Sequence, residues 1–235
     1  YEVNIRVHIK PALGATKLSA LTTHQIQLFY NRLSKGNDQG PVLSPKYVKN
    51  IHGVLHKALG QAVVMGFIKF NPSDACRTPC VEKPGIKPLE DAEITRFLKA
   101  IKGHKYETLF VVSLFTGMRR GEILGLTWDC VDFNNGTIQI NRQLQRIGEE
   151  YTFVALKNDK PRRITPAQYV MRLLKDYKKI QNGWKLKAGV LWKSRDFVFT
   201  NEMGAHFTHV TVSMNFKRVA RSIGLNETRL HDLRH

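Results

Sequence analysis

The sequence predicts a mainly α-helical protein with one small antiparallel β-sheet, arranged as two domains. Three observations support this fold class. Apolar residues recur at helical spacing over most of the chain. β-type segments are confined to the region 137–165, where turn residues separate them. A stretch rich in proline and glycine, residues 78–88, interrupts the helical pattern because it cannot continue a helix.

The first domain is predicted over residues 1–78 and reads as helical throughout. Thr22 and Gln25 have the spacing of a capping box and start one helix. A second helix starts at Ser44 and Pro45, a cap residue followed by proline at the first helical position. Five apolar residues form the buried stripe of this second helix: Val48, Ile51, Leu55, Leu59 and Ala62.

The opposite side of the second helix carries Lys46, Lys49, Gly53, Lys57 and Gly60. Each glycine costs a helix about 1 kcal/mol, and here both lie between or beside lysines. One interpretation is that the glycines let a phosphodiester backbone approach, with Lys46, Lys49 and Lys57 contacting DNA phosphates. The alternative is a solvated lysine face with incidental glycines, and the sequence favours neither.

A linker is predicted over residues 79–89 and a second domain over residues 90–235. Glu90 and Asp91 cap the first helix of this domain, and the almost wholly apolar run 107–115 predicts a buried helix. A turn signal, Asn-Asn-Gly, then introduces the β-type segments. These segments are expected at 137–146, 150–156 and 162–165, and helical pattern resumes at 167–181 and 209–223.

The chain carries 37 Lys and Arg against 19 Asp and Glu, a formal net charge of +18 at pH 7. Residues 1–88 contain 12 basic and 4 acidic side chains, and residues 89–235 contain 25 and 15. Such an excess predicts a polyanionic partner, nucleic acid first and an anionic membrane surface second. Because each half is basic, the charge distribution favours two domains that grip one duplex over one domain with a basic tail. Neither a membrane span nor a signal peptide is evident, so a cytoplasmic location is expected.

The three cysteines, Cys76, Cys80 and Cys130, favour a reducing compartment because their number is odd and no secretory signal is evident. The spacing of Cys76 and Cys80 is not that of a zinc site. The sequence also lacks GxxxxGK[ST], GxGxxG, HExxH and GxSxG motifs, and it has no evident acidic cluster for two-metal chemistry. We therefore expect no metal and no other cofactor.

The residues that stand out chemically are cationic. Arg119 and Arg120 follow the buried helix, Lys157 ends a β-segment, and His231 and Arg234 lie three residues apart. Arginine side chains can hold the non-bridging oxygens of a phosphodiester in bidentate geometry. A lysine can protonate a departing oxygen, and a histidine can exchange the proton of a nucleophile. This set is suited to metal-free phosphoryl transfer through a covalent intermediate.

Two segments carry a resemblance to a known family. Residues 116–126 (TGMRRGEILGL) strongly resemble the first arginine box of tyrosine recombinases, the phage integrase family. Residues 231–235 (HDLRH) resemble the start of the family's second box. Residues 18–33 and 43–72 look like its helical core-binding domain, so the resemblance extends over nearly the whole chain. It is nearest to integrases of temperate phages or conjugative transposons.

This resemblance implies a SAM-like core-binding domain over residues 1–78, N-terminally incomplete, and an α+β catalytic domain over residues 90–235. The implied activity is site-specific recombination, in which DNA strands are cut and rejoined through a 3′-phosphotyrosyl intermediate. The implied partners are double-stranded DNA, three further copies of the protein in a homo-tetramer on two DNA sites, and an accessory DNA-bending protein. No membrane partner is expected.

The resemblance also implies roles for individual residues. Arg119 and Arg234 would bind the scissile phosphate, Lys157 would be the general acid and His231 the acid–base partner. Glu122 occupies the acidic position after the first arginine and would support that site. Lys160 lies close enough in sequence to compete with Lys157 for the acid role.

The family's nucleophilic tyrosine follows the second box, whereas all seven tyrosines of this sequence precede it. We therefore expect a chain that binds DNA without a nucleophile of its own. Two alternatives stay open: a non-catalytic DNA-binding protein with the recombinase fold, and a type IB topoisomerase. Among the boxes, Arg120 is open to interpretation as a plain surface charge and His235 as a packing residue.

Overall fold

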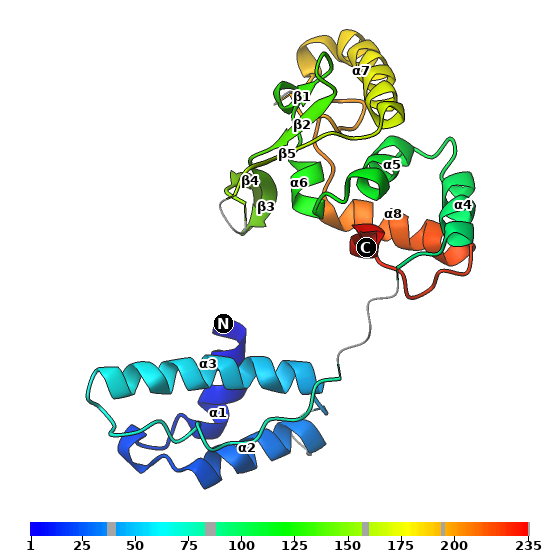
Figure 1. Cartoon of the computed structure of the whole chain (residues 1–235). Helices are drawn as coiled ribbons and strands as arrows, with labels where there is room; N and C mark the ends of the chain where they lie inside the picture. The colour runs from blue at the N-terminus through cyan, green and yellow to red at the C-terminus, as the bar shows by residue number, and fades with distance from the viewer. Residues whose placement is uncertain (37–40, 83–87, 157–159, 194–195, 235) are drawn as a thin grey trace. The chain divides into compact units, whose positions relative to one another are not determined.

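The structure is a computed structural model that describes residues 1–36, 41–82, 88–156, 160–193 and 196–234 (Figure 1). The chain divides into two compact units, Tyr1–Pro84 (unit 1) and Gly85–His235 (unit 2). Each unit has its own hydrophobic core. Within the described residues, no helix is both long enough and apolar enough to cross a membrane.

Unit 1 is built from helices. In chain order they are a π-helix at Asn4–Ile9, α1 (Lys10–Leu13), a 3₁₀ turn at Leu18–Ala20, α2 (Thr23–Lys35) and α3 (Pro45–Val64). The predicted capping box starts α2, because the backbone N–H of Gln25 donates to Thr22 Oγ1 and that of Thr22 donates to Gln25 Oε1. Ile26 and Phe29 of α2 pack with the apolar stripe of α3 to form the core.

The two sides of α3 follow the predicted pattern with one exception. All five residues of the apolar stripe are buried, and Lys46, Lys49, Gly53 and Lys57 are exposed. Gly60 is the exception, because it is half-buried and a Cβ there would lie 3.9 Å from Asn71 Nδ2. The residues after α3 fold back over this turn, so Gly60 does not belong to the lysine side.

Unit 2 holds five α-helices in its described residues: α4 (Asp91–Ala100), α5 (Glu107–Thr116), α6 (Arg120–Leu124), α7 (Gln168–Ala188) and α8 (His209–Ser222). Short 3₁₀ turns lie at Trp128–Cys130, Gly189–Leu191 and Leu230–Arg234; the last is η5. The apolar run predicted as a buried helix is α5, whose residues Leu109 to Ser113 are all buried. Phe97 of α4, Phe110 of α5 and Phe216 of α8 contact one another in the core.

The strands form two small antiparallel sheets. One has the order β1 (Val131–Asp132), β2 (Thr137–Ile140), β5 (Arg162–Ile164), and the other pairs β3 (Gln143–Ile147) with β4 (Glu150–Val154). The mainly helical fold class is confirmed, but the strands form two sheets where one was predicted, because the predicted segment 137–146 is two strands. It breaks at Arg142, whose Nη2 donates to Thr127 Oγ1 and Asp129 Oδ2 and so anchors the chain between the sheets.

Candidate functional site

The end of α5 brings two cationic segments together. Gly117 ends this helix in the left-handed conformation, with φ 59° and ψ 21°, and its N–H donates to the Ser113 carbonyl. Glycine adopts this conformation without the steric cost that a side chain would incur. The Cβ that a side chain would add at Gly117 lies 3.6 Å from Cγ of Arg234. Arg234 of η5 therefore packs against Gly117, which lies two residues before Arg119 in the chain. The two arginines themselves are far apart in sequence.

Arg119 is the N-cap of α6 and is fixed there by Glu122. Its backbone N–H donates to Glu122 Oε2 at 2.8 Å, and its Nη1 donates to Glu122 Oε1 at 2.9 Å. The Glu122 side chain is 1% exposed, whereas that of Arg119 is 34% exposed. The carboxylate thus lies inside the protein while the guanidinium reaches the surface.

A second arginine, Arg162 of β5, also binds Glu122. Its Nη1 donates to Oε1 at 3.0 Å and its Nη2 donates to Oε2 at 2.6 Å. This residue could not be selected from the sequence, because the partners are 40 positions apart and no spacing pattern links them. Because buried charges are paired in proteins, the burial of Glu122 agrees with its binding by two arginines. We call Arg119, Glu122 and Arg162 the arginine site.

The arginine site holds its carboxylate ionised. Burial alone raises the pKa of Glu122, but the hydrogen bonds from Arg162 and Arg119 outweigh burial and lower the pKa to about 2. The same contacts raise the pKa of Arg162. Two guanidinium groups on one carboxylate leave the site with net positive charge. Within the described residues, Nε and Nη2 of Arg119 make no hydrogen bond, so this edge can bind an anion.

Gly121 of α6 and Gly125, the C-cap of this helix, let β3 pack closely against α6. A Cβ at Gly121 would lie 3.1 Å from the Leu144 carbonyl oxygen, and one at Gly125 would lie 2.7 Å from the Leu144 backbone nitrogen. These distances leave no space for a side chain at Gly125. The glycines of the first box are therefore explained by close packing of β3 on α6.

The other predicted site residues differ in where they lie and in whether the structure describes them. His231 is exposed on η5, which packs against α5 and α8. Lys157 and His235 lie outside the described residues, and Lys160 is exposed. Arg120 is exposed, and its Nη1 donates to Ser213 Oγ of α8 at 3.0 Å. The structure thus brings Arg119 and Glu122 together and packs Arg234 beside Gly117, two residues before Arg119.

In unit 1, Lys46, Lys49 and Lys57 share the exposed side of α3 with Gly53; we call this surface the lysine face. Among the residues that the structure describes, none of these lysines has an ion pair or a hydrogen bond through its amino group. A Cβ at Gly53 would meet no atom within 4 Å. The surface is cationic, open and free of carboxylate partners.

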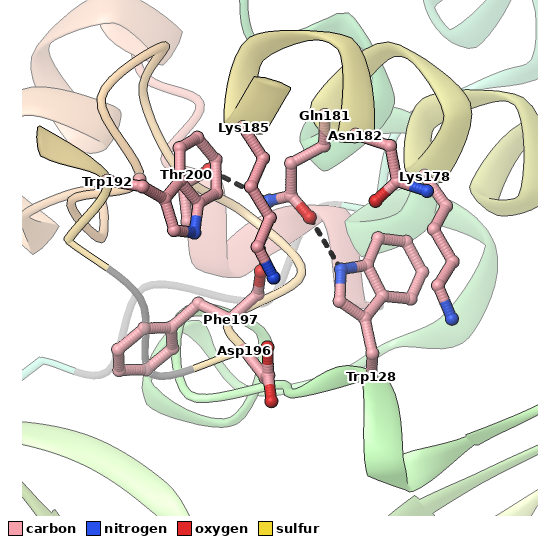
Figure 2. A pocket seen from close by; sticks show the side chains of 10 residues that line it. Trp128, Lys178, Gln181, Asn182, Lys185, Trp192, Asp196, Phe197 and Thr200 are labelled. Atoms are coloured by element: carbon pink, nitrogen blue, oxygen red, sulfur yellow. Dashed lines mark hydrogen bonds between the residues drawn. The ribbon is translucent and has the colours of Figure 1, made fainter. Parts of the chain in front are cut away.

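A cavity of about 250 Å³ lies elsewhere in unit 2 (Figure 2). Gln181 of α7 is one of the lining residues: it accepts from Trp128 Nε1 at 2.6 Å and donates to Thr200 Oγ1 at 2.8 Å. Lys178 lies over the Trp128 ring, 5.0 Å from its centroid. None of the lining residues belongs to the arginine site, and we assign the cavity no ligand. In the described parts of the chain, no group of three or more His, Cys, Asp or Glu side chains is placed to hold a metal ion.

Comparison with known proteins extends over both units. The sequence model of the phage integrase family matches residues 87–235, and that of the phage integrase N-terminal SAM-like domain matches residues 1–34. A XerC-like tyrosine recombinase of Caldanaerobacter subterraneus is 28% identical and covers 100% of this chain and 64% of its own length. The ICEBs1 integrase of Bacillus subtilis is 24% identical over 98% of this chain and 62% of its own length. The chain thus spans less than two thirds of these relatives.

Solved structures share the fold. An integrase of the Tn1549 transposon, in complex with transposon right-end DNA, superimposes with a TM-score of 0.85 at 24% identity, covering 100% of this chain and 77% of that one. A lambda integrase tetramer bound to a Holliday junction gives a TM-score of 0.68 at 18% identity, covering 100% and 63%. The family match includes the whole arginine site and Arg234. From the sequence motifs, the fold and this match, the chain belongs to the phage integrase family of tyrosine recombinases.

Proposed function

We propose that this chain is the DNA-binding and phosphate-activating part of a site-specific DNA recombinase. The recombinase cuts one strand through a 3′-phosphotyrosyl link and rejoins it to a partner duplex. The single observation that carries the proposal is the placement of Arg119: it is fixed by a buried carboxylate, it is partly exposed, and it lies beside the segment that packs Arg234 on Gly117.

The chemistry follows from that placement. A phosphodiester under attack gathers negative charge on its non-bridging oxygens, and guanidinium groups held in place stabilise that charge without reorganising. Arg119 offers Nε and Nη2, and Arg234 supplies the second cation. His231 exchanges the proton of the nucleophile, and Lys157 protonates the departing 5′-oxygen. Glu122 keeps Arg119 in position.

None of the seven tyrosines is assigned the role of nucleophile. Tyr30, Tyr106 and Tyr177 are buried. Burial raises the pKa of Tyr30, and it raises the pKa of Tyr177 to about 12. Tyr151 shares a 2.8 Å hydrogen bond with His209, and Tyr47 donates to Asn4. The proposed nucleophile follows the second box in the complete recombinase, as the family resemblance implies.

Double-stranded DNA is the proposed partner of both units. The lysine face supplies phosphate contacts, which give affinity without base readout. The net charge of +18 supports this assignment. Recombination proceeds in a homo-tetramer on two DNA sites in the cytoplasm, assisted by a DNA-bending protein. The lambda integrase tetramer on a Holliday junction supports the tetrameric arrangement.

The test is the salt dependence of duplex binding by the purified chain. With Lys49→Glu and Lys57→Glu together, we expect weaker binding to every duplex and a salt slope lower by about 0.9 for each lost phosphate contact. Lys17→Glu is the matched control, since Lys17 is an exposed lysine of unit 1 outside α3. Undiminished affinity at low salt would remove the lysine face from the interface. Binding without strand cleavage by the complete protein would favour the non-catalytic alternative.

A further inference from the structure

Arg119 and Arg162 use their hydrogen-bond donors on Glu122 in different ways. Arg162 commits both terminal nitrogens to the two carboxylate oxygens, in the bidentate arrangement that fixes a carboxylate most firmly. Arg119 commits only Nη1 and its backbone N–H. With four donors, the carboxylate is fully satisfied. Arg162 therefore anchors Glu122, and Arg119 keeps one guanidinium edge free.

The charges of the arginine site also indicate that Arg162 serves Glu122, whereas Arg119 is available to an anion. A buried carboxylate paired with Arg119 alone would form a neutral pair, and its negative charge would oppose a phosphate that approached the same guanidinium. Arg162 adds a second positive charge 2.6 Å from the carboxylate. With Arg162 present, the site keeps a net positive charge toward an anion at Arg119.

The position of Arg162 is set by the sheet. β5 pairs antiparallel with β2, so Arg162 lies opposite Ile140, whose side chain is buried. Its neighbour Arg163 is exposed and lies opposite Gln139. Because successive side chains of a strand point to opposite faces, Arg162 faces Glu122 and Arg163 faces away from it.

We propose that Arg162 is a positioning residue for the phosphate-binding Arg119. It binds Glu122 and offsets its charge, so that Arg119 keeps both a fixed orientation and a full positive charge for a DNA phosphodiester. This inference rests on the proposed function, because it assumes that Arg119 binds the scissile phosphate.

The test compares four variants of the complete recombinase: Arg162→Gln, Arg162→Lys, Glu122→Gln/Arg162→Gln and the matched control Arg163→Gln. Two quantities are measured below the melting temperature of the least stable variant: the dissociation constant for duplex DNA, and the rate of covalent complex formation on a nicked duplex. We expect Arg162→Gln to slow cleavage at least about tenfold, with duplex affinity nearly unchanged. Arg163→Gln should behave as the wild type. Arg162→Lys, which keeps the charge but not the bidentate contact, should recover part of the rate.

The double variant separates charge compensation from a structural role. Glu122→Gln removes the negative charge that Arg162 offsets, so the double variant should cleave faster than Arg162→Gln alone. A double variant no faster than Arg162→Gln, or a single variant as fast as Arg163→Gln, overturns the inference. If Arg162→Gln does not fold, the double variant decides: cleavage no better than that of Arg119→Lys overturns it. A wild type that binds no DNA, or binds without cleaving, would instead overturn the proposed function.

Discussion

On α3, three lysines lie exposed and make no ion pair within the described residues. At the start of α6, by contrast, one arginine is fixed by two hydrogen bonds to a buried glutamate that a second arginine also binds. The first surface can follow a phosphate backbone at many positions, since flexible lysine chains adapt to it. The second can hold one phosphate in one orientation. The two regions thus indicate two roles for cationic residues in this chain. The exposed lysines give affinity for DNA, and the arginine fixed by Glu122 orients one phosphate.

The largest effect on stability is expected at the buried carboxylate. Glu122→Ala leaves Arg119 and Arg162 as neighbouring like charges with no partner, and breaking such a buried network costs about 3–5 kcal/mol in the free energy of unfolding. Chemical denaturation followed by tryptophan fluorescence measures it, because all three tryptophans lie in unit 2. The matched change Glu93→Ala removes a partly exposed glutamate of α4 and should cost far less. Equal losses would mean that the arginine site is not a fixed network.

Acid should weaken unit 2 through the same residue. The pKa of Glu122 is about 2 in the folded chain and close to 4.5 when unfolded, so the stabilisation is complete above pH 4.5. It is lost as the pH falls from 4.5 through 2, because protonation removes the charge that both arginines bind. Thermal unfolding across this range measures the loss. Glu122→Gln should show a flatter acid profile than the wild type, and identical profiles would contradict the assignment.

Glycine-to-alanine changes in the two regions should have smaller effects on stability, and these effects should have opposite signs. Gly125→Ala should destabilise unit 2 by about 1–3 kcal/mol, because the added Cβ would overlap the backbone of β3. Gly53→Ala on the lysine face meets no atom and should stabilise α3 by up to about 1 kcal/mol. If the same variant also weakens duplex binding, the DNA backbone approaches α3 at Gly53. Unchanged binding would favour the solvated-face alternative.

Much of this architecture could be predicted from the sequence because it is locally encoded. The caps at Thr22 and Ser44, the apolar stripe of α3 and the buried run of α5 each depend on residues within one or two turns. The strand break at Arg142 was missed because it depends on contacts with Thr127 and Asp129, which no periodicity reports.

The candidate site likewise has contacts that could be predicted from the sequence and contacts that could not. Arg119 and Glu122 are three residues apart and could be paired from the sequence, since an N-cap and its N3 residue are neighbours in any helix. Arg162 could not, because β5 reaches Glu122 only through the register of a small sheet. The placement of Arg234 against Gly117 likewise depends on how η5 packs on α5.

The separation of affinity from orientation is tested most directly by measuring duplex affinity and cleavage rate on the same two variants of the complete recombinase. We expect Arg119→Lys to slow covalent cleavage by about 10²–10³-fold while duplex affinity stays close to that of the wild type. The Lys49→Glu/Lys57→Glu variant should lose affinity yet cleave at the wild-type rate once DNA is saturating. If Arg119→Lys cleaves as fast as the wild type, or if both variants lose affinity and rate together, the two regions do not have the separate roles assigned to them.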